Sequence, residues 1–177
     1  MNKKVYKVVA AGLLIALSIV LTRVFSTYLM IAGIPGARLA IGFVPIILAS
    51  IALGPYFGMV TGALADVLGY VIFPSGAYFP PITITSMLVG IIPFLIVKVI
   101  KTKKVWAKVL VAVATTQILC SMFLQTLWIA LLYDLSYGDL FFPRAVVTLI
   151  TIPVYSLLIY YISIALKKAN LMPDQNL

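Results

Sequence analysis

Long apolar segments dominate this sequence and decide what it can fold into. The first covers residues 5–25 and contains no acidic side chain. A helix of about 20 apolar residues is what the hydrocarbon core of a bilayer requires, whereas a barrel strand needs only roughly 10. Lipid offers no hydrogen-bond partners to an open backbone, so the segments should be helical. Because 64% of the 177 residues are hydrophobic and only 10% are charged, we expect an integral membrane protein.

Breaks rich in glycine, proline and charge separate the apolar segments. They predict an all-α integral membrane fold, a compact bundle of six transmembrane helices in a single domain, residues 1–177. The predicted helices cover residues 5–25, 39–53, 56–73, 82–99, 105–132 and 144–166. The loops at 26–36, 74–81 and 133–142 all fall at one end of this bundle, which is the outer end if the termini are cytoplasmic.

The lysines set the expected orientation. Every lysine lies near the N-terminus, at or between the adjoining ends of the fourth and fifth spans, or just after the sixth. Six crossings place these three segments on one side of the membrane. Short cytoplasmic loops are enriched in lysine and arginine, so we expect cytoplasmic N- and C-termini in a multi-pass protein of the plasma membrane. The same lysines can contact anionic membrane lipid.

The arginines follow the opposite rule. Arg23, Arg38 and Arg144 fall at the outer ends of the first, second and sixth spans, where the positive-inside bias disfavours them. A guanidinium group is a planar fork of donors that fits a carboxylate, so these arginines suit an anionic solute. The alternative is a local role, in which they pair with Asp134 and Asp139 or reach lipid headgroups.

Asp66 lies inside the third span, where an unpaired carboxylate costs several kcal/mol. Glycines precede it at intervals of four residues, from Gly54 to Gly62, and this spacing forms a helix stripe where another backbone can approach closely. Two interpretations remain open. Asp66 either pairs with Arg38 or Arg23 and pins the bundle, or it accepts hydrogen bonds from an amine-bearing heterocycle.

Aromatic side chains gather toward the outer end of the predicted bundle. An interfacial belt explains many of them without a ligand, but the cytoplasmic side carries fewer, which favours a stacking pocket for a flat molecule. Gln125, Thr83 and Thr85 can add polar contacts, although satisfied polar groups inside a bundle are the commoner explanation. The candidate ligand-binding residues are Arg23, Arg38, Phe43, Asp66, Tyr70, Tyr78, Phe79, Gln125, Trp128 and Arg144.

Several classes of protein are excluded by what the sequence lacks. It has no histidine and a single cysteine, Cys120, so a histidine-based triad or a common zinc site cannot be built, and we expect no metal site. It has no G-x-x-x-x-G-K-[ST] phosphate loop, so it is not an ATPase. We expect a binding subunit rather than an enzyme, with no cofactor of its own. The net charge is +9, but the basic residues flank apolar segments, which argues against nucleic acid as a partner.

Four motifs in order resemble one family of transport proteins. They are LSIVLTRVFS at the end of the first span, R-x-x-x-G-F-x-P-I at 38–46, G-P-x-x-G-x-x-x-G-A-x-A-D at 54–66, and FPSGAYFP at 73–80. Together they resemble the substrate-binding S components of energy-coupling factor (ECF) vitamin transporters, most closely the folate-specific type. The likeness covers residues 5–94 well, and the second half of the chain in hydropathy and loop placement only.

The resemblance implies a six-helix protein that captures folate at its outer end, with the outer loops as gates. It implies docking on a transmembrane T component bound to two cytoplasmic ATPases, which use ATP to topple the S component and release the vitamin inside. In this family the first helix docks through an A-x-x-x-A motif, and the nearest match here is Gly12 and Ala16. The resemblance also implies that Arg23 contacts the pterin or its linked benzoate.

Folate combines a flat heteroaromatic ring with a dianionic tail. Under the same interpretation the aromatic residues stack on the ring, Asp66 accepts hydrogen bonds from its amine-bearing edge, and Arg38 or Arg144 faces the tail. One alternative is an S component for riboflavin, thiamine or a queuosine precursor, although cationic thiamine should require more acidic groups. Another is a structural subunit of an envelope-assembly complex, which would need neither Asp66 nor the glycine stripe.

Overall fold

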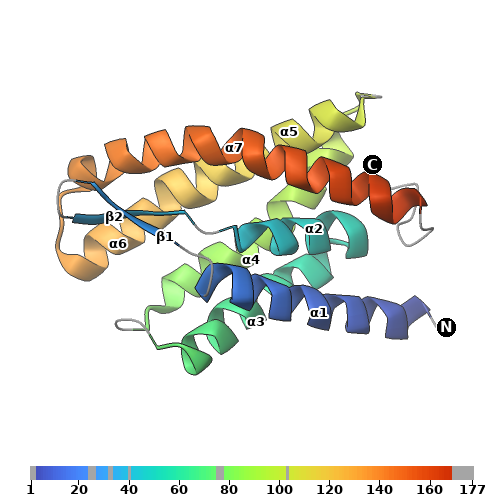
Figure 1. Cartoon of the computed structure of the whole chain (residues 1–177), viewed down its shortest axis with the longest axis horizontal. Coiled ribbons are helices and arrows are strands. Elements are labelled where there is room, and N and C mark those ends of the chain that lie inside the picture. The colour runs from blue at the N-terminus through green and yellow to red at the C-terminus, as the bar shows by residue number, and fades with distance from the viewer. Residues whose placement is uncertain are drawn as a thin grey trace.

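The computed structural model describes residues 3–23, 27–31, 34–39, 41–74, 78–102 and 104–168. Within these residues the chain forms six continuous helical rods and one two-stranded hairpin (Figure 1). The rods are α1 (Lys3–Arg23), α2 (Phe43–Leu53), α3 (Pro55–Ile72), α4 (Pro80–Val99), α5 with η1 and α6 (Val105–Thr116, Gln117–Leu124, Gln125–Tyr133), and α7 (Tyr137–Lys168). The predicted helical membrane bundle is confirmed. Among the same residues, five rods are long and apolar enough to cross a membrane.

Different segments lie at the two ends of the bundle. The start of α1 and the end of α7 lie at one end, with the α2–α3 turn and the α4–α5 connection (Figure 1). We call this the lysine end, because the lysine-bearing segments meet there. The β1–β2 hairpin, the α3–α4 connection and the α6–α7 corner lie at the opposite end, which we call the hairpin end. The predicted spatial grouping of the lysine-bearing segments is therefore confirmed.

The second predicted span, 39–53, is shorter than expected. α2 has 11 residues and is about 17 Å long, too short for a hydrocarbon core of about 30 Å. All of its residues after Phe43 are buried, because a helix that is apolar on every face belongs in the interior. Ile47 and Ile51 lie in the same hydrophobic core as Val89 and Ile159. α2 is thus the buried centre of the bundle.

The predicted loop at 26–36 contains an antiparallel hairpin. β1 (Thr27–Ile31) pairs with β2 (Ile34–Leu39), and Tyr28 stands opposite Arg38. The predicted helix start at residue 39 is wrong for this reason, because β2 continues to Leu39. Pro35 and Gly36 suggested a loop, but both lie in β2. Both strands of a two-stranded sheet are edge strands, where proline is tolerated.

α7 begins earlier than predicted. The loop expected at 133–142 is reduced to a corner, in which Asp134 adopts a left-handed conformation (φ 52°) after α6 and α7 starts at Tyr137. The predicted helix start at residue 144 is therefore wrong, and Pro143 lies inside α7. Arg144 is consequently about two turns into the helix rather than at its end.

The glycine stripe packs α3 closely against its neighbours, as its spacing predicted. A Cβ atom at Gly58 would overlap the carbonyl oxygen of Gly90 in α4 and would lie 2.7 Å from the Cα atom of Ser50 in α2. One turn further along, a Cβ atom at Gly62 would overlap the carbonyl oxygen of Ser86. The α3 and α4 backbones are therefore in direct contact.

Candidate ligand-binding site

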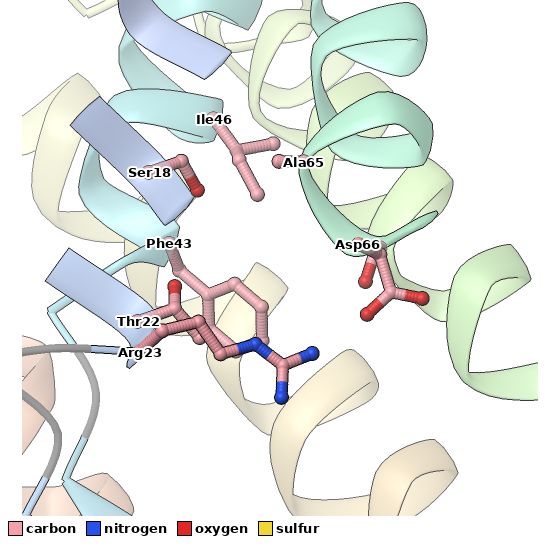
Figure 2. Close-up of a pocket in the computed structure, with 8 residues that line it drawn as sticks. Ser18, Thr22, Arg23, Phe43, Ile46, Ala65 and Asp66 are labelled. Atoms are coloured by element: carbon pink, nitrogen blue, oxygen red, sulfur yellow. The ribbon is translucent and has the colours of Figure 1, made fainter. Parts of the chain in front are cut away.

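A small pocket with polar and apolar walls lies between α1, α2, α3 and α4, in the half of the bundle nearer the hairpin end (Figure 2). The described residues that line it are Ser18, Thr22, Arg23, Phe43, Ile46, Ala65, Asp66 and Ser86. Its volume of about 40 Å³ is room for roughly three water molecules. The pocket brings together three residues that the sequence predicted as ligand contacts, namely Arg23, Phe43 and Asp66.

Arg23 is the last residue of α1 and reaches toward α3. Its Nε atom lies 3.4 Å from the position that a Cβ atom would take at Gly69. Gly69 follows Asp66 by three residues and therefore shares its helix face. Figure 2 shows the guanidinium group and the Asp66 carboxylate facing the same space. A fork of cationic donors and an anionic acceptor thus flank one pocket.

Gly42 fixes the end of α1 against the start of α2. Ser18 Oγ donates a hydrogen bond of 2.7 Å to the Gly42 carbonyl oxygen. A Cβ atom at Gly42 would overlap the Thr22 side chain, so only glycine permits this contact. The contact orients the last turn of α1, which carries Arg23. It also places Phe43, the residue after Gly42, at the pocket.

Asp66 is held by two hydroxyl groups in series. Thr83 Oγ1 in α4 donates a hydrogen bond of 2.6 Å to Asp66 Oδ2. The Tyr78 hydroxyl lies 2.9 Å from the same Thr83 oxygen. The sequence suggested Arg38 or Arg23 as the partner of Asp66, and the structure adds a neutral hydrogen-bond donor from α4.

The predicted aromatic residues form two pairs at the hairpin end. Tyr70 and Tyr78 have ring centroids 5.1 Å apart, and Phe79 and Trp128 have centroids 6.3 Å apart. Trp128 Nε1 also donates a hydrogen bond of 3.0 Å to Thr85 Oγ1. The first pair joins α3 to the segment before α4, and the second joins that segment to α6.

The remaining predicted residues lie elsewhere in the described structure. Arg144 lies partly buried in α7, and its Nη1 atom is 3.5 Å from the Ser121 carbonyl oxygen in the π-helical segment η1. Gln125 is the partly buried first residue of α6. Arg38 belongs to β2, and its side chain lies outside the part that is described. Among the described residues, only Arg23 of the three arginines lines the pocket.

Three polar residues of the pocket wall, Ser18, Thr22 and Ser86, were not predicted from the sequence. A signal existed for Ser18 and Thr22. They are four residues apart and so share a face of the first helix, and Thr22 directly precedes Arg23. Ser86 had no comparable signal, since a serine in an apolar helix usually bonds to its own backbone. Ser86 Oγ does donate to the Ile82 carbonyl oxygen at 3.2 Å.

The described residues thus form an apolar helical bundle with a pocket lined by Arg23 and Asp66. The sequence matches the family described as "ECF transporter, substrate-specific component" over residues 6–163. This match covers most of the chain, and the chain therefore belongs to the family of ECF transporter S components. These are substrate-binding subunits of multi-pass membrane transporters and are not enzymes.

Two relatives and one solved structure make the comparison more specific. The chain is 32% identical over 160 residues to the folate transporter FolT of Clostridium novyi (strain NT), covering 89% of this chain and 88% of the relative. It is 26% identical over 159 residues to the folate transporter FolT of Leuconostoc mesenteroides, covering 87% and 82%. A crystal structure of FolT bound with folic acid superposes with a TM-score of 0.72 at 28% identity, covering 87% of this chain and 90% of that one.

Proposed function

We propose that this chain is a high-affinity folate-binding S component. It captures folate at the hairpin end and delivers it inward when docked on the ECF module. The observation that carries the proposal is the pocket in which Arg23 and Asp66 face the same space beside the Phe43 ring. Folate has anionic groups for a guanidinium, amine donors for a carboxylate and a flat ring for aromatic contacts. The FolT relatives support the same ligand.

Folate entry requires the site to expand. The pocket volume of about 40 Å³ is far below the roughly 300 Å³ at which ligand pockets usually begin. The hairpin end contains the aromatic pairs Tyr70–Tyr78 and Phe79–Trp128, whose separation would open a path for a flat ring. We therefore assign these aromatic residues, with Gln125, to the wall of the open site.

The exposed face of α1 is the proposed docking surface. Gly12 and Ala16 are exposed, and a Cβ atom at Gly12 would meet no atom within 4 Å. Val9 and Leu13 are exposed on the same helix. The partners assigned to this apolar surface are the T component and, through it, two cytoplasmic ATPases, which hydrolyse the ATP. The S component itself needs no cofactor in this scheme.

The lysine end is assigned to the cytoplasm. The described lysines of α1, of the α4–α5 connection and of α7 lie at that end, and cytoplasmic segments are enriched in lysine. This orientation puts both termini inside the cell and the pocket nearer the outer surface. Folate would then enter from the hairpin end, where the outer leaflet lies.

Fluorescence titration tests the ligand assignment directly. The chain has two tryptophans, Trp128 beside Phe79 and Trp106, which meets Tyr160 edge to face at a centroid distance of 5.5 Å. A Trp106→Phe variant in detergent therefore reports on Trp128 alone. We expect folic acid to quench this fluorescence saturably with one site per chain, and thiamine to leave it unchanged.

The reverse variant provides the control for this titration. Trp128→Phe keeps only Trp106, far from the proposed site, and measures the loss of signal that comes from light absorbed by the ligand. A saturable response to riboflavin or thiamine with none to folic acid would assign a different vitamin. Equal, unsaturable responses of the two variants to every vitamin would contradict the proposed function.

A further inference from the structure

The hydrogen bonds around Asp66 have a defined direction. A threonine hydroxyl has one hydrogen to donate and two lone pairs to accept with. Thr83 donates its hydrogen to Asp66 Oδ2, so the bond between Tyr78 and Thr83 must have the tyrosine hydroxyl as its donor. The chain therefore runs from Tyr78 through Thr83 to Asp66, and every hydroxyl hydrogen in it points toward the carboxylate.

This chain fixes the orientation of the carboxylate. One oxygen of Asp66 is taken by Thr83 at 2.6 Å, which is within the range of charge-assisted O–H···O⁻ bonds. In Figure 2 one carboxylate oxygen points toward the side of the pocket where the Arg23 guanidinium lies, and the other points away from it. The α3–α4 contact at Gly62 and Ser86 holds the two helices together one turn away, so Thr83 cannot drift from Asp66.

We propose that Thr83, itself oriented by Tyr78, is a positioning residue that holds one Asp66 oxygen and so presents the other to the amine-bearing edge of a bound heterocycle. The inference rests on the proposed function, because it names how the folate site would select its ring. Thr83 makes no contact with the ligand in this arrangement and acts through Asp66. A carboxylate free to rotate would have to be ordered on binding, at a cost in affinity.

A purely structural role for Thr83 makes a different prediction. If its hydroxyl only satisfies a carboxylate inside the bundle, its loss should lower the stability of the unliganded protein without a specific effect on ring recognition. If it positions Asp66, its effect on affinity should disappear once Asp66 can no longer act as an anionic acceptor. A double-mutant cycle separates these cases, because residues that act through one another give non-additive effects.

The test is a calorimetric titration of detergent-purified protein with folic acid. Thr83→Val removes the hydroxyl at nearly constant shape, and we expect affinity to fall about tenfold, the loss of one hydrogen bond to a charged group. Thr83→Ser should restore it to within about twofold. Combined with Asp66→Asn, Thr83→Val should cost nothing further. Thr116→Val is the matched control, a buried threonine whose hydroxyl bonds to the Ala112 carbonyl of its own helix.

The outcomes are distinct. Full affinity in Thr83→Val, no rescue by serine, or an added loss on top of Asp66→Asn would each overturn the positioning role while leaving folate binding intact. Wild-type protein that binds no folic acid would overturn the proposed function and this inference together. Should Thr83→Val not fold, Tyr78→Phe removes the donor at the other end of the chain, and its loss of affinity must likewise vanish in the Asp66→Asn background.

Discussion

Gly58→Ala should destabilise the protein by overpacking the contact between α3 and α4. The added methyl group would overlap the Gly90 carbonyl oxygen and would lie 2.7 Å from the Ser50 Cα atom. Both obstacles are backbone atoms of neighbouring helices, so no side chain can rotate away to make room. Overpacking of a well-packed core typically costs about 1–3 kcal/mol, and we expect the free energy of unfolding to fall by about that amount.

The reciprocal variant sharpens this prediction. A Cβ atom at Gly90 would overlap the Gly58 carbonyl oxygen, so Gly90→Ala should cost a similar amount. Once either methyl group has moved the two helices apart, the second methyl group fits with less overlap. The double variant should therefore lose less than the sum of the single losses, with a coupling of at least about 0.5 kcal/mol, as for residues in direct contact.

Unfolding in mixed detergent micelles, followed by tryptophan fluorescence, measures these free energies. Gly12→Ala is the control, because it makes the same change on an open helix face where no atom lies within 4 Å. It should be neutral or stabilising by up to about 1 kcal/mol, because alanine is favoured over glycine inside a helix, and this gain is the baseline for the two core variants. If Gly58→Ala proved as stable as Gly12→Ala, or if the two core variants were strictly additive, the close α3–α4 contact would be refuted.

Three further predictions concern the proposed function. Arg23→Ala should weaken folic acid binding by about 1.5–3 kcal/mol, the range for hydrogen bonds to charged groups; unchanged calorimetric affinity in folded protein would assign Arg23 to lipid contact. Gly12→Leu should abolish folate uptake by cells yet spare binding by purified protein, whereas Leu149→Trp, on the exposed face of α7, should spare both; loss of binding in Gly12→Leu would give that face to the fold. Arg144→Met should weaken folic acid more than pteroic acid, which lacks the glutamate tail, and equal losses for the two would exclude a tail contact.

The order and number of the helices could be predicted from the sequence because each depends on local composition. Gly54–Pro55 correctly marked the turn before α3, since glycine adopts the left-handed backbone (φ 106°) that this turn requires and proline fits the first turn of a helix. The glycine stripe also predicted a close backbone approach, and the structure identifies α4 as the neighbour. These features follow from rules that involve neighbours along the chain.

Features that depend on packing could not be predicted. The burial of α2 on every face depends on the rods that surround it. The predicted span also included Leu39, which belongs to β2, and the turn at 41–42 before α2. The π-helical η1 has no sequence signature, although it supplies the Ser121 carbonyl near Arg144. Within the pocket, Arg23 and Asp66 stood out because charge is costly in lipid. Thr83 could not be assigned to Asp66 without the helix crossing that aligns them.

The central claim is that folate binds between Arg23 and Asp66. An experimental structure of this protein with folic acid tests it most directly. We expect the pterin ring in an expanded pocket, with its amine-bearing edge against the Asp66 oxygen that Thr83 does not bond and with Arg23 in contact with the ligand. Folic acid bound away from both side chains, with the Asp66–Thr83 hydrogen bond and the α1–α3 pocket unchanged, would contradict it.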